Sequence, residues 1–162
     1  MKHIKLFENF EDEHDIDLIV DNYIEALIWT QEGVGEDADG NDPMDGKNIS
    51  DINKESKEEI KKEVEWFINS AGDVFEELSD DQIGHDLWLT RNGHGSGFFE
   101  RIEEKENLEI IEELCDILGN AEVFVNDDGE IYHESNDRYK TFNLKEYRKE
   151  KEFDKTVKKF NL

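Results

Sequence analysis

The side chains best suited to metal or acid–base chemistry gather in one segment, residues 84–101 (GHDLWLTRNGHGSGFFER). It contains His85, Asp86 and His94, and imidazole and carboxylate groups are common ligands of transition metals. The spacing argues against a metal site, because neighbouring residues of a strand point to opposite faces of a sheet. His94 would have to approach across a turn, with His133 completing the set. We therefore expect structural histidines and no resident metal.

Nucleophilic and phosphate-binding chemistry has weaker support. Cys115 falls on an apolar helical stripe, where a small buried thiol is the usual reason for a cysteine. Ser96 lacks the G-x-S-x-G elbow that would expose a nucleophile between a strand and a helix. The glycines around Ser96 are not followed by the lysine of a phosphate-binding loop. The sequence thus predicts neither a catalytic residue nor a cofactor.

A run of oxygen-bearing side chains in residues 36–48 invites comparison with a calcium loop. The sixth position of such a loop is normally glycine, whereas here it is Asp42, and the last is an asparagine instead of a bidentate glutamate. We expect only weak, nonspecific binding of divalent cations. The residues with the matching offsets are Asp37, Asp39, Asn41, Asp45 and Asn48.

The spacing of apolar residues predicts the elements that would hold these side chains. Residues 16–31 read as an amphipathic helix capped by Asp15. An acidic loop follows, and an S-x-x-E capping box beginning at Ser56 then predicts a second helix that continues past a bend at Gly72.

Within the segment itself, residues 87–90 alternate as in a strand, Asn92 and Gly93 suit a turn, and Phe98 would begin the returning strand. A third helix is expected from a cap at Asn107 to Gly119, followed by a hairpin around Asp128 and Gly129. The predicted fold class is α+β: amphipathic helices packed on a small antiparallel sheet, in a single domain with a basic C-terminal helix.

The chain is intensely acidic, with 44 Asp and Glu against 19 Lys and Arg and a formal net charge of -25 in 162 residues. Such a field repels nucleic acid and attracts basic proteins, including proteins that hold nucleic acid. A lone cysteine and the lack of a long apolar run predict a protein of a reducing compartment with no membrane partner.

Charge also divides the chain. Residues 138–162 carry a net charge of +5 and residues 1–137 a net charge of -30. We therefore expect a leader at 1–14, an acidic α+β domain at 15–137 and a basic amphipathic tail at 138–162 with Phe153, Val157 and Phe160 on one side. Two interpretations stay open: the tail folds back onto the acidic body, or it is an arm that binds a partner.

The string GHDLWLTRNGHG, followed by a glycine and two aromatic residues, resembles a recurrent signature of small bacteriophage and prophage proteins. The D-D-G-x-I-Y pattern ending at Tyr132 fits the same resemblance, which covers residues 79–132; Leu87 and Phe99 depart from it. The resemblance implies a phage origin and a compact α+β module, and it carries no catalytic residue. Its signature positions are His85, Asp86, Trp88, Arg91, Asn92 and His94.

These observations favour a non-enzymatic phage accessory protein, acting in anti-defence or host takeover in the host cytoplasm. It would bind and inhibit a basic nucleic-acid-handling host protein by imitating the charge of DNA. The alternatives are a metal-binding or hydrolytic enzyme using His85, Asp86 and His94, and a structural protein of the virion. The expected binding face comprises Asp17, Asp21, Glu25, Asp37, Asp39, Asp42, Asp45, Glu58, Glu59, Glu63 and Glu65.

Overall fold

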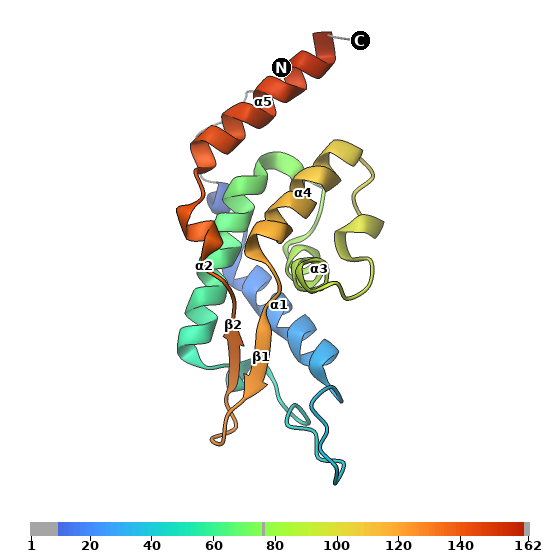
Figure 1. Ribbon diagram of the computed structural model, residues 1–162, viewed down its shortest axis with the longest axis vertical. Coiled ribbons are helices and arrows are strands. Elements are labelled where there is room, and N and C mark those ends of the chain that lie inside the picture. The colour runs from blue at the N-terminus through green and yellow to red at the C-terminus, as the bar shows by residue number, and fades with distance from the viewer. Residues whose placement is uncertain (1–9, 76, 161–162) are drawn as a thin grey trace.

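A computed structural model describes residues 10–75 and 77–160 of the chain. The described part contains five α-helices and one antiparallel two-stranded sheet (Figure 1). The predicted α+β fold class is therefore confirmed. In chain order the elements are α1 (Ile16–Gln31), α2 (Lys54–Ala71), α3 (Asp80–Asn92), α4 (Lys105–Leu118), β1 (Glu122–Val125), β2 (Ile131–Glu134) and α5 (Leu144–Phe160).

The first helix is as predicted. The Asp15 side chain caps α1 by accepting a hydrogen bond from the Leu18 amide at 3.1 Å. The apolar stripe of α1 is buried, mainly against α3. The two helices approach closely at Gly84, where a Cβ atom would overlap the backbone carbonyl oxygen of Ile19. A glycine at this position is therefore required by the packing.

The start of the second helix differs from the prediction. Asn53, not Ser56, caps α2, with its side chain accepting hydrogen bonds from the amides of Glu55 and Ser56. Ser56 is buried inside the helix, and its hydroxyl accepts a hydrogen bond from the His133 amide at 3.1 Å. The helix also ends at Ala71 and is followed by a short 3-10 turn instead of continuing past the bend.

The largest error concerns residues 84–101, predicted as strand, turn and strand. They form the second half of α3, a loop and a 3-10 turn at Gly97–Glu100. The buried residues Ile83, Leu87, Trp88 and Arg91 have helical spacing, and Gly93 ends the helix in the left-handed conformation at φ 69°. Four alternating residues were too few to separate a strand from a buried helix.

The rest of the body agrees more closely with the prediction. The third predicted helix is α4, which begins at Lys105, two residues before the expected cap at Asn107, and ends before Gly119. The predicted hairpin is confirmed: β1 pairs with β2 in antiparallel register, with Val123 opposite His133. An isolated parallel bridge between Ile52 and Ile131 ties β2 to the start of α2.

The C-terminal helix α5 projects from one end of the body (Figure 1). Only its beginning is buried, through Tyr147 and Arg148. Phe153 and Phe160 are 67% and 77% exposed, so most of the predicted apolar side does not pack on the body. Across the described residues, no helix combines the length and apolar character needed to cross a membrane.

Candidate functional site

A buried polar network centred on Arg91 joins four elements. The Arg91 guanidinium, on α3, donates to Glu63 of α2 at 2.6 Å and to the Tyr23 hydroxyl of α1 at 3.1 Å. It also donates to the carbonyl oxygens of Leu118 and Gly119, at 3.0 and 2.9 Å, where α4 ends. Arg91 therefore neutralises a buried carboxylate and satisfies carbonyl groups that a helix terminus leaves without partners.

The same network fixes His133. Its Nε2 lies 2.7 Å from the Tyr23 hydroxyl, and burial together with the nearby Arg91 charge lowers the pKa of His133 to about 3. The histidine is therefore neutral at physiological pH. Burial also raises the pKa of the Tyr23 hydroxyl. Both groups are locked in one protonation state, which suits a structural role and not proton transfer.

The other signature positions also have structural contacts. The indole of Trp88 donates to Thr30 at 2.6 Å, which links α3 to α1. The Asn92 side chain accepts a hydrogen bond from the Ala121 amide at 2.8 Å, which positions the start of the hairpin. Together with Arg91, these contacts make α3 the element that connects the rest of the fold. The signature thus encodes packing and connectivity.

His85, Asp86 and His94 do line one open hollow, although they come from a helix and a loop and not from a hairpin. The hollow has a volume of about 460 Å³ and also includes Arg101 and Trp29. The Asp86 carboxylate is buried. It lies 2.5 Å from Arg101 Nε, which offsets its charge, and 3.1 Å from His85 Nδ1. His94 stacks against Trp88.

The fold separates His133 from the other candidate metal ligands and buries the candidate thiol. His133 lies in the Arg91 network and not with His85 and His94. Within residues 10–75 and 77–160, no three His, Cys, Asp or Glu side chains are grouped as metal ligands. Burial raises the pKa of the Cys115 thiol to about 12, so that thiol stays protonated at neutral pH.

The acidic loop uses its carboxylates to order its own backbone. Asp37 accepts hydrogen bonds from the amides of Asp39 and Asn41, and hydrogen bonding with Asn41 lowers the pKa of its carboxyl. Asp42 accepts from the amides of Gly33 and Met44. Met44 is buried and anchors the loop on the core. These contacts account for the aspartates as local turn formers.

The acidic face expected on the first two helices is only partly exposed: Asp17, Glu25 and Glu58 are exposed, Asp21, Glu59 and Glu65 are half-buried, and Glu63 requires a correction. Glu63 is 2% exposed and paired with Arg91, so it cannot contact a partner. Asp17 and Asp21 face lysines of α2, at 3.0 and 3.2 Å, which offsets part of their charge. Glu59 is likewise shared between Lys62 and Lys140. The α1 and α2 surface is therefore less negative than the sequence implies.

A denser set of carboxylates lies on α4 and was missed by the sequence analysis. We call it the α4 carboxylate row. The spacing of these carboxylates places them opposite the apolar stripe of the helix, and this spacing can be seen in the sequence. It was not singled out because the charged side of an amphipathic helix usually only faces solvent. Five exposed carboxylates lie within eleven residues, a span of about 15 Å at the rise of an α-helix. They belong to Glu106, Glu109, Glu112, Glu113 and Asp116.

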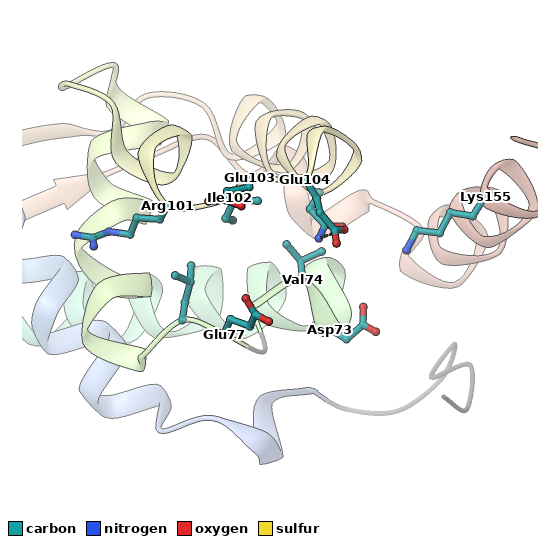
Figure 2. A pocket seen from close by; sticks show the side chains of 10 residues that line it. Asp73, Val74, Glu77, Arg101, Ile102, Glu103, Glu104 and Lys155 are labelled. Carbon is teal, nitrogen blue, oxygen red and sulfur yellow. Dashed lines mark hydrogen bonds between the residues drawn. The ribbon is translucent and has the colours of Figure 1, made fainter. Parts of the chain in front are cut away.

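An acidic groove of about 540 Å³ lies beside the first turn of α4. Figure 2 shows Asp73 and Glu77 on one side of it and Glu103 and Glu104 on the other. Its apolar lining comes from Val74, Leu78 and Ile102. The Lys155 side chain extends from α5 toward this groove (Figure 2), so the chain itself places a cation at its mouth.

The lysines of α5 also reach the α4 carboxylate row. Lys151 Nζ lies 2.9 Å from Glu113, and Lys158 Nζ lies 3.9 Å from Glu106. The tail therefore turns its basic side toward the acidic body and its phenylalanines away from it. The tail contacts the body through charge, but Phe153 and Phe160 stay exposed, so the apolar burial expected of a folded-back tail is not found. The interpretation as a partner-binding arm stays a prediction.

Comparison with known proteins gives no relative: no protein-family model, curated protein or solved structure matches the chain.

Proposed function

We propose that this is a non-enzymatic accessory protein, of phage origin as the signature implies, that binds and inhibits a basic nucleic-acid-handling host protein in place of nucleic acid. The observation that carries the proposal is the α4 carboxylate row. Five charges over about 15 Å place one charge every 4 Å or so along the axis of α4, close to the roughly 3.4 Å of duplex axis per phosphate of one DNA strand.

The acidic groove extends this charge onto the neighbouring connection between α2 and α3. A cleft built for a phosphate backbone presents lysines and arginines, and these would pair with the carboxylates of the row and groove. Lys151 and Lys158 from α5 offset the charges of Glu113 and Glu106, as lysines do on α1 and α2, and leave Glu109, Glu112 and Asp116 for a partner; their contacts also show basic side chains of a helix against the row. Electrostatic steering would make association fast and dependent on salt.

The experiment begins with affinity capture of host proteins from lysate, with and without nuclease. Each captured host protein is then purified, and duplex DNA is tested as a competitor for its binding to this chain. Binding that survives nuclease and is displaced by DNA supports the proposal. Binding that DNA leaves unchanged contradicts it.

A matched pair of triple variants tests the surface itself. Glu109→Gln, Glu112→Gln and Asp116→Asn remove three charges from the row, and we expect at least about tenfold weaker binding, since each charge pair contributes on the order of 0.5–1 kcal/mol. The control removes three charges on the hairpin, whose turn lies away from α4 (Figure 1), and should weaken binding far less. Its substitutions are Glu122→Gln, Asp127→Asn and Asp128→Asn.

A hydrolytic function is a second candidate, favoured by the single observation that His85, Asp86 and His94 share a hollow. In that case His94→Ala would abolish an activity and leave partner binding intact. If the His94→Ala variant inhibits the partner as strongly as the unmodified protein does, the result favours a binding protein over a hydrolytic enzyme.

A further inference from the structure

Trp29 is an exposed aromatic side chain that the fold does not use. Of the three tryptophans, Trp88 is buried and Trp66 packs against Tyr139 and Phe142, whereas Trp29 is 63% exposed near the end of α1. Its only ring partner among the described residues is His85, with the two planes inclined by 26°. Large aromatic side chains left in water are characteristic anchors of protein interfaces.

The indole stands between two hollows. One is the hollow of His85, Asp86 and His94, and the other has a volume of about 420 Å³ and is lined by Glu25, Ile28 and Glu32. A side chain arriving at Trp29 therefore finds room on either side of the ring. This arrangement differs from an isolated surface aromatic, because the neighbouring space is shaped to receive a side chain.

The charges around Trp29 specify the ligand. Glu25 lies four residues before Trp29 on α1, and Glu32 is the residue that follows the last turn of the helix. Both line the same hollow as the indole. Lys47 lines the same hollow and offsets one of these two charges. In the other hollow Glu100 adds a carboxylate to the paired Asp86 and Arg101, so each hollow keeps a net negative charge.

An anion would be repelled here, and an apolar side chain would strip water from the carboxylates without replacing it. A guanidinium satisfies both parts of the site, because it stacks on an aromatic face and pairs with a carboxylate at its edge. A lysine ammonium lacks the planar surface for stacking.

We propose that Trp29 is the docking point for an arginine side chain of the basic partner, with the guanidinium on the indole and flanked by Glu25 and Glu32. The proposal rests on the proposed function and deepens it by naming the side chain that the protein recognises. It also predicts a preference that overall charge does not: arginine over lysine at equal charge.

The test uses the full chain and two probes, hexa-arginine and hexalysine peptides. We expect the protein to bind hexa-arginine about two- to fivefold more tightly, the range of one cation–π contact. The indole Nε1–H resonance of Trp29 should shift on titration. Trp29→Ala should abolish the preference, while Phe153→Ala, which removes an aromatic ring of similar exposure on α5, should retain it.

A second pair of variants separates recognition from charge. Glu25→Gln should reduce the arginine preference, whereas Glu112→Gln, which removes one carboxylate of the α4 row, should weaken both peptides alike. Equal affinity for the two peptides, or a preference that survives Trp29→Ala, overturns the Trp29 proposal and leaves the acidic-surface proposal standing. Failure to bind either peptide overturns both.

Discussion

Replacing Arg91 with methionine removes the donor that holds four elements of the fold together. The variant loses hydrogen bonds to Glu63, Tyr23 and the carbonyl oxygens of Leu118 and Gly119. Methionine is long and apolar enough to fill much of the space, so the main loss is electrostatic. Glu63 is left as a buried carboxylate without a cation.

Breaking a buried ion pair by removing one partner costs about 3–5 kcal/mol, and the unfolding free energy of a domain is about 5–15 kcal/mol. We therefore expect Arg91→Met to lose about 3–5 kcal/mol in urea unfolding followed by circular dichroism. The double variant with Glu63→Leu removes both charges and should lose clearly less than the sum of the two single variants, because no buried charge is left unpaired.

Two results would refute this reasoning. A loss below about 1 kcal/mol for Arg91→Met would mean that the network is not structural. Additive losses in the double variant would mean that Arg91 and Glu63 act independently, in spite of their 2.6 Å contact.

Three further predictions concern stability and reactivity. Gly84→Ala should cost about 1–3 kcal/mol through overlap with α1, while Gly35→Ala, where a Cβ meets only ordinary contacts, should cost far less; equal losses would contradict the packing argument. Because the folded pKa of His133 lies at about 3, below its ordinary value of 6.5, the unfolded chain takes up the proton first as pH falls. The stability that neutral, buried His133 contributes is therefore complete above pH 6.5 and is lost as the pH falls toward 3, with about 2 kcal/mol lost at pH 5. The His133→Gln variant should lack this loss when the pH profiles of the unfolding free energy of the two proteins are compared. Cys115 should resist alkylation at pH 8 until urea unfolds the chain, and rapid labelling of the folded protein would contradict its burial.

Local patterns were sufficient to predict the elements whose signals agree with one another. α1 has a cap and a long apolar stripe, and the hairpin has a turn at Asp128 and Gly129 between two short strands. The fold class followed from these elements. The predicted start of α2 failed because two polar residues, Asn53 and Ser56, both fit a helix cap, and only the packing of Ser56 against β2 decides between them.

The site was harder to predict, because its contacts join residues far apart in the sequence. Arg91 reaches a carboxylate 28 positions earlier and carbonyl groups about as far ahead, and no local pattern indicates either. The sequence therefore placed Glu63 on the surface, where acidic residues normally lie. It also gave no sign that Trp29 would remain exposed, since aromatic residues on a helix are usually buried.

The most direct test of the central claim is the displacement of the protein from a purified, captured partner by duplex DNA of increasing concentration at fixed ionic strength. If the acidic surface occupies the nucleic-acid site, the apparent Kd of the protein for its partner rises in proportion to the DNA concentration. The variant with three substitutions in the α4 carboxylate row is then displaced at a lower DNA concentration than the unmodified protein. An apparent Kd that stays constant while the partner is saturated with DNA would contradict the account.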